Sequence, residues 1–159
     1  MPKLARTIRF DESDGNVFAR PAGSGEWAIP GGFEFSNWSE GDLVGKARQA
    51  FANGWLSVES FGRSTFVAVA QIETAELEHL AARLADHFVA TYGAPDRAAA
   101  LPIAQTEIAY MEELCADHAP NTLLVVSRDL TTAGVRESFR AITPAEAEID
   151  IVAVHGTPD

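Results

Sequence analysis

The stretch Ser64-Thr65-Phe66-Val67-Ala68-Val69-Ala70-Gln71-Ile72 is the clearest β-strand in this chain of 159 residues. Apolar residues occupy both alternating sets of positions, with Phe66, Ala68, Ala70 and Ile72 on one face and Val67 and Val69 on the other. A strand that is apolar on both faces is typical of the interior of a sheet. We therefore predict a central strand that is covered on both sides.

Shorter strand-like segments lie on both sides of this central strand. Before it, the sequence predicts strands over residues 4–10, 17–20, 26–29 and 33–35, with a turn at 14–16 and a polar loop at 60–64. After it, the sequence predicts strands over residues 123–126, 135–142 and 149–154, with a turn at 132–134. Glycine marks both turns, since it adopts positive φ angles without steric cost.

Three helices are predicted between the two groups of strands, over residues 41–53, 75–92 and from about 102 to 119. Ser39 is the expected N-cap of the first helix, with Asp42 placed for a capping box. Thr74 is the expected cap of the second, whose apolar residues recur with helical spacing. Proline is tolerated in a first helical turn, so the third helix is expected to begin at Pro102. The preceding residues, 96–101, are ambiguous.

Strands therefore cluster at both ends of the chain and helices lie between them. A doubly wound parallel sheet would need regular alternation of strands and helices, which this order lacks. We predict one α+β domain over residues 1–159, with a mostly antiparallel sheet and about three helices packed on one side of it. The tail at 156–159 is expected to be disordered.

Composition excludes several classes of partner. The formal net charge is −11, and apolar residues make up 47% of the chain. A surface this acidic repels nucleic-acid phosphates and anionic lipid. The first residues lack a signal-peptide core, and no apolar run approaches the roughly 18 residues that span a bilayer. We expect a cytoplasmic protein with no nucleic-acid or membrane partner.

The run Trp27-Ala28-Ile29-Pro30-Gly31-Gly32-Phe33 resembles the opening of the phosphate-hydrolase motif of Nudix enzymes. In that motif a helix with clustered glutamates follows and binds a divalent metal. Residues 43–54 contain no acid here, and Lys46 and Arg48 would repel a cation. We therefore interpret the glycines as a backbone bend at a sheet edge. A backbone-lined binding loop is the alternative.

The sequence predicts neither a metal site nor a cofactor. His79 and His87 would lie about 12 Å apart along one helix, too far to share a metal directly. The chain contains no HExxH, paired CxxC, Walker A or GxGxxG motif. Cys115 ends an apolar helical stripe and is expected to be a buried structural residue, although His118 lies three residues further on.

Aromatic and basic residues suggest a binding surface. Aromatic residues crowd one section of the chain, and Arg63 could bind an anion with Arg48 and Lys46 opposite. The candidate ligand- or partner-binding residues are Trp27, Phe33, Phe35, Trp38, Arg48 and Arg63. The alternating segment 135–142 would suit an exposed sheet edge, so we also predict a homodimer.

Four stretches resemble an uncharacterised family, a domain of unknown function found in short alphaproteobacterial proteins. They are residues 17–21, 26–33, 45–54 and 60–66. The resemblance covers most of the first 70 residues and brings no catalytic or binding residue with it. It implies a small bacterial protein that is accessory to a larger enzyme system.

Three hypotheses for the function follow. The leading one is a non-catalytic accessory or binding protein that acts through its aromatic and arginine surface, with no catalytic residue assigned. The second is a small enzyme that acts on an anionic small-molecule substrate. The third is a structural subunit of a homodimer, with its aromatic residues buried in the core or in the interface.

Overall fold

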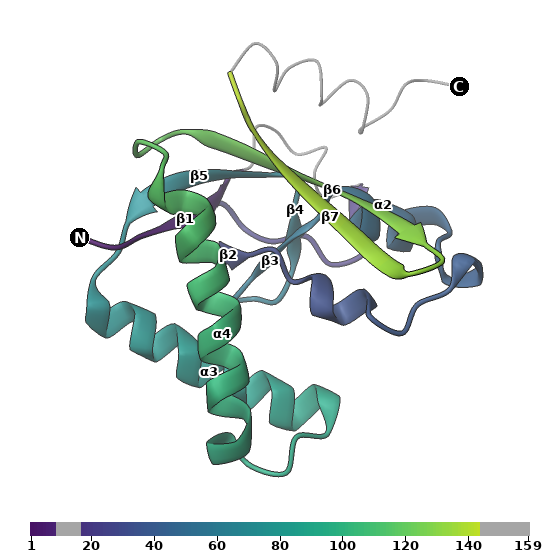
Figure 1. The fold of residues 1–159 in the computed structure, drawn as a ribbon, viewed down its shortest axis with the longest axis horizontal. Helices are drawn as coiled ribbons and strands as arrows, with labels where there is room; N and C mark the ends of the chain where they lie inside the picture. The colour runs from purple at the N-terminus through teal and green to yellow at the C-terminus, as the bar shows by residue number, and fades with distance from the viewer. Residues whose placement is uncertain (9–16, 144–159) are drawn as a thin grey trace.

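The computed structural model describes residues 1–8 and 17–143, and its strands form one antiparallel sheet (Figure 1). The sheet order is β4-β3-β2-β1-β5-β6-β7. The strands are β1 Lys3–Ile8, β2 Trp27–Ile29, β3 Trp55–Ser57, β4 Arg63–Ser64, β5 Phe66–Gln71, β6 Leu123–Thr131 and β7 Gly134–Ile142. With the helices described below, the prediction of an α+β fold with an antiparallel sheet is confirmed.

Strand β5 lies inside the sheet, between β1 and β6, as the sequence predicts. Val67 and Val69 are fully buried in the main core. Phe66 points to the opposite face, where it forms a second, smaller cluster with Leu123, Val125 and Ile142. The alanines on that face are only half-buried. The second face is therefore fully covered at Phe66 and partly covered beyond it.

The three α-helices whose bounds lie within the described residues are α2 Gly45–Asn53, α3 Thr74–Tyr92 and α4 Arg97–Ala116. Helices α3 and α4 pack against each other on one side of the sheet, and α4 contacts β1 and β2 (Figure 1). Helix α2 lies apart from this pair and contacts β6 and β4. Two 3-10 helices, η1 Gly32–Phe35 and η2 Glu40–Asp42, precede α2.

The ends of α3 and α4 follow from local chemistry. Gly93 takes a left-handed conformation with φ 74° and ends α3. Asp96 then caps α4 by accepting a hydrogen bond from the Ala99 amide at 2.8 Å. Helix α4 therefore begins at Arg97 rather than at Pro102, which lies inside the helix. Glu73, and not Thr74, occupies the N-cap position of α3.

Several predictions for the first half of the chain are wrong. Residues 17–20 form no strand, and residues 33–35 belong to the 3-10 helix η1. The predicted helix over 41–53 is divided, because the capping box of Ser39 and Asp42 closes the short η2 instead. The predicted loop at 60–64 contains β4. These segments are too short for periodicity to show, and tertiary pairing decides them.

In the second half, β6 is longer than the predicted 123–126 and reaches Thr131. In its outer half, Arg128 is buried between two exposed residues. Because a charged residue occupies this buried position, the sequence does not show the apolar alternation that would predict a strand. The turn before Gly134 is confirmed, with φ 116° at that glycine. The predicted turn at 14–16, the strand at 149–154 and the tail at 156–159 lie outside the described residues.

Cys115 is fully buried in the main core, and burial raises the pKa of its thiol to about 12. Because the thiolate is the reactive form, native Cys115 is expected to react with a disulfide reagent at pH 8 roughly 100-fold more slowly than the unfolded chain. The colour yield from dithionitrobenzoate with and without denaturant measures this difference. Equal rates would contradict the burial of Cys115.

Candidate functional site

Two buried arginines, Arg63 on β4 and Arg128 on β6, lie where the curled sheet brings β6 close to the loop after β2. Arg63 donates hydrogen bonds to the carbonyl oxygens of Pro30, Gly31 and Gly54 at 3.3, 3.1 and 3.1 Å. Its fourth bond goes to the Glu34 carboxylate. The planar guanidinium suits this many fixed acceptors. We call this pair the arginine junction.

Arg128 uses several of the same acceptors. It donates to the carbonyl oxygens of Pro30 at 2.5 Å, Phe51 at 2.9 Å and Gly54 at 2.9 Å, and to the Glu137 carboxylate at 2.6 Å. The Phe51 and Gly54 carbonyls lie at the C-terminal end of α2, where a cation is favourable. The arginine junction therefore ties β4, β6 and α2 to the loop after β2.

The run Pro30-Gly31-Gly32 supplies backbone acceptors to the arginine junction. The carbonyl oxygens of Pro30 and Gly31 face the guanidinium groups, whereas a phosphate-binding loop presents amide hydrogens to an anion. Gly31 has φ 69°, and a Cβ atom there would lie 2.4 Å from the Cβ of Leu56. The φ of Gly31 fits the predicted backbone bend, but the bend follows β2, which lies between β3 and β1 and is not an edge strand as predicted.

Charge within the junction is locally compensated. Burial lowers the pKa of Arg63 to about 10 although Glu34 opposes the shift, so Arg63 stays protonated at neutral pH. Glu34 accepts hydrogen bonds from Arg63 through one oxygen and from the Tyr92 hydroxyl through the other. Burial and the bond to Glu34 raise the pKa of Tyr92. Both oxygens of Glu34 are therefore occupied.

A pocket of about 490 Å³ opens beside the junction, within the size range of small-molecule sites. We call it the aromatic–cationic pocket. Its walls carry five aromatic rings, those of Phe18, Phe35, Trp38, Phe61 and Tyr92. Its charged residues are Arg20, Glu34, Lys46 and Arg63. These residues come from β4, η1, α2, the end of α3 and the loops between elements. They therefore do not form one sequence motif.

Arg20 and Lys46 differ from the buried arginines of the junction. Both side chains are exposed, and neither makes an ion pair or hydrogen bond with any part of the chain that the structure describes. The first turn of α2, which holds Lys46, contains no acid to offset its charge. In a chain with net charge −11, the pocket therefore gathers two positive charges that make no ion pair with a described residue.

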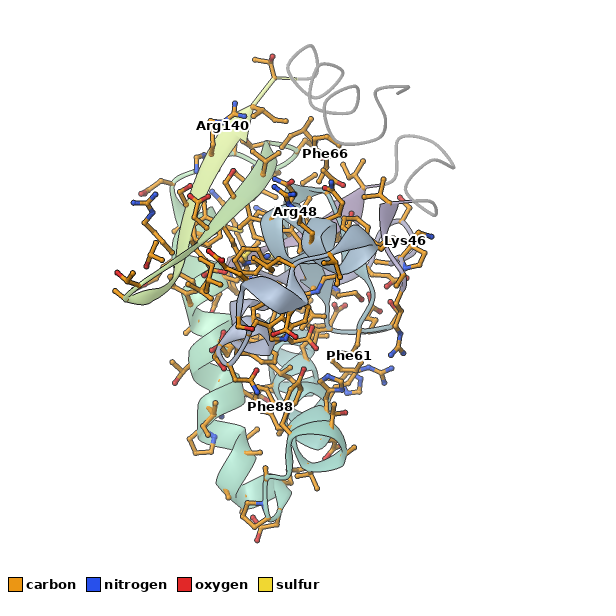
Figure 2. The ribbon with its side chains drawn as sticks, turned by 90° about the vertical axis from the view of Figure 1, so that its right-hand side faces the viewer. Lys46, Arg48, Phe61, Phe66, Phe88 and Arg140 are labelled. Atoms are coloured by element: carbon orange, nitrogen blue, oxygen red, sulfur yellow. The ribbon has the colours of Figure 1, made fainter. Side chains whose placement is uncertain are left out.

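Three of the candidate residues from the sequence, Phe35, Trp38 and Arg63, meet in this pocket. Arg48 does not line it, although Lys46 on the same helix does. Residues two positions apart point to different sides of a helix, and Figure 2 labels Lys46 and Arg48 at separate places on α2. The set predicted from sequence is therefore brought together in part.

The other two candidates lie elsewhere. Trp27 is buried, donates through Nε1 to Glu76 at 2.7 Å and lies 4.0 Å beneath the guanidinium of Arg6. Phe33 lines a separate cavity of about 390 Å³. Glu107 and Glu137 also line that cavity, where burial and then Glu137 raise the pKa of Glu107.

The candidate residues from the sequence did not include the pocket residues Phe18, Arg20, Glu34, Lys46, Phe61 and Tyr92. Residues 17–20 resembled a strand, and Tyr92 simply ended a helix. Phe61 has φ 60°, an uncommon conformation for a residue other than glycine. Ser60 and Gly62 on either side of Phe61 were the available signal for a tight turn, because serine and glycine are common turn residues.

His87 lies next to the pocket. Its ring stacks on Phe61 at 3.8 Å between centroids, and its Nε2 atom is buried without a hydrogen-bond partner among the described residues. Burial lowers the pKa of His87, against the attraction of Glu34. Within residues 1–8 and 17–143, no three His, Cys, Asp or Glu residues are grouped to hold a metal ion.

In the described part of the chain, no helix has the length and apolar character that crossing a bilayer requires.

Comparisons with known proteins identify the family of this chain. No curated protein and no solved structure matches the chain significantly. One family model matches all of residues 1–159, and its description is a family of unknown function. The chain therefore belongs to DUF6505, a family of unknown function.

Proposed function

We propose that this protein binds a small organic anion in the aromatic–cationic pocket. The observation that carries the proposal is a hollow walled by aromatic rings, with two exposed cations, Arg20 and Lys46, that no described residue pairs with. The rings would contact the apolar body of the ligand, and the two cations would bind its charged group. The candidate residues Phe35, Trp38 and Arg63 take part as walls of the pocket.

The geometry supports a small molecule better than a macromolecule. Phe35 and Arg63 are 2% and 6% exposed, so a flat protein surface could not reach them. Glu34, the carboxylate of the pocket, already accepts hydrogen bonds from Arg63 and Tyr92. A general base must be able to accept a proton from the substrate, and an occupied carboxylate is poorly placed for that role. Binding without catalysis is therefore the function that we propose.

Isothermal titration with 2-naphthoate tests this proposal, with neutral 2-naphthamide as the probe of equal shape. We expect the double variant Arg20→Ala/Lys46→Ala to bind 2-naphthoate about tenfold more weakly, since each partly exposed charge contributes up to about 1 kcal/mol. Arg48→Ala removes an exposed charge from the same helix and is expected to leave binding unchanged.

Equal affinities for the acid and the amide would contradict the proposal, as would equal losses in Arg48→Ala and the double variant. Circular dichroism should show unchanged folding in all variants, because none of the three side chains is buried. Raising the salt concentration should weaken the binding of 2-naphthoate and leave 2-naphthamide unaffected.

We also propose that the protein forms a homodimer through β7. This strand ends the described sheet, and its inner neighbour is β6. Exposed and half-buried residues alternate along it, which is typical of an edge that another strand can join. Light scattering over a range of concentrations measures the mass in solution. A mass of 17.1 kDa at all concentrations would exclude the dimer.

A further inference from the structure

Phe61 is held in an unfavourable backbone conformation at the wall of the aromatic–cationic pocket. Its φ of 60° is rare for a bulky residue, and such strain persists where surrounding contacts enforce it. Gly62 follows it, and a Cβ atom there would lie 2.6 Å from the carbonyl oxygen of Pro21. The loop of Phe61 is therefore packed directly against the segment that holds Arg20.

Backbone hydrogen bonds fasten these two segments together. The Arg63 amide donates to the carbonyl oxygen of Arg20 at 2.8 Å, and the Ala22 amide donates to that of Arg63 at 2.8 Å. Pro21 and Arg63 also form a parallel bridge. An aromatic ring and an exposed guanidinium are thus presented from two segments that are bonded side by side.

The orientation of the Phe61 ring is fixed as well. His87 stacks on it with an interplanar angle of 6° and a centroid separation of 3.8 Å. Helix α3 carries His87, so the ring is supported from a rigid element rather than from its own loop. A ring held in this way offers a planar ligand a contact that needs little ordering on binding.

The pocket suits a ligand whose charged group is a carboxylate better than one whose charged group is a phosphate. A guanidinium binds either a carboxylate or a phosphate through two parallel hydrogen bonds, so the surrounding backbone and charge decide between them. Phosphate sites typically add several backbone amides, but the glycine loop next to this pocket turns its carbonyl oxygens toward the arginines. Glu34 in the pocket wall would also repel a dianion more strongly than a monoanion.

We propose that the ligand of this pocket is an aromatic carboxylate, whose ring contacts Phe61 and whose carboxylate binds Arg20 and Lys46. This inference rests on the proposed function and specifies its ligand class. It makes Phe61 a residue that selects aromatic over saturated ligands.

The experiment compares 2-naphthoate with decalin-2-carboxylate, a saturated ligand of equal charge and similar size, and with inorganic phosphate. Aromatic pairing adds to burial of apolar area, so we expect the wild-type protein to bind 2-naphthoate about fivefold more tightly than the decalin acid. Phe61→Leu is expected to abolish that preference and to leave the decalin acid unaffected. Phosphate at the same concentrations is expected not to bind.

The outcomes separate the two proposals. Equal binding of both acids by the wild-type protein would overturn the aromatic preference and leave organic-anion binding standing. Tighter binding of phosphate than of either acid would overturn the ligand class and the proposed function together. Binding of neither acid would contradict both proposals. These comparisons use the wild-type protein and hold even if Phe61→Leu fails to fold.

Discussion

Arg128→Met is expected to lower the free energy of unfolding by about 3–5 kcal/mol, the cost of breaking a buried ion pair by removing one partner. Methionine fills a similar volume but donates no hydrogen bond. The carbonyl oxygens of Pro30, Phe51 and Gly54 would each lose a donor, and Glu137 would keep a half-buried charge without its partner. Pro30 and Gly54 would retain their bonds to Arg63.

Chemical denaturation followed by tryptophan fluorescence measures this loss, since Trp55 is fully buried in the core. Arg136→Met is the matched control on the same hairpin. Arg136 pairs with Asp129 at 3.3 Å, and both side chains are about 70% exposed. Its loss is expected to cost less than about 1 kcal/mol. Similar effects of the two substitutions would show that the arginine junction does not hold the sheet together.

Gly31→Ala is expected to destabilise the protein by about 3 kcal/mol or more, from left-handed strain of about 1–2 kcal/mol and overpacking of about 1–3 kcal/mol. The added Cβ atom would lie 2.4 Å from the Cβ of Leu56 and 3.2 Å from Arg63. Leu56 is fully buried and has no space to retreat. The substitution would therefore push the loop away from the arginine junction.

Gly25→Ala separates strain from packing. Gly25 has φ 79°, close to that of Gly31, but an added Cβ atom there would meet nothing within 4 Å. We expect a loss of about 1–2 kcal/mol from strain alone. Thermal and chemical unfolding of the two variants give the comparison. An equal loss in both would mean that the close approach of Gly31 to Leu56 contributes nothing.

Elements that the sequence predicts well are those whose signal repeats locally. Strand β5 alternates over six residues, and α3 repeats its apolar stripe over 19 residues. In both elements the pattern of apolar residues therefore repeats several times. The short β3 and β4 have three and two residues and exist because neighbouring strands pair with them. No window of sequence that short carries a period.

The residues of the candidate site likewise divide into those with a local sequence signal and those without one. Phe35, Trp38 and Arg63 were found because aromatic and basic residues crowd one section of the sequence. Tyr92 was missed because it joins Glu34 across 58 residues. The sequence suggested that Arg63 is available to a ligand, whereas its four side-chain hydrogen bonds fix it within the arginine junction. Arg20 and Lys46 are the pocket cations that make no ion pair or hydrogen bond with a described residue.

The amino-acid sequence by itself determined the α+β class, the central strand and the absence of acidic residues from the helix that follows the glycine bend. These are properties of composition and of short-range periodicity. Only the tertiary structure decided what the bend does and where the pocket lies. The reason is that Arg128 meets the Pro30 carbonyl across 98 residues, and the positions of groups so far apart depend on how the whole sheet curls.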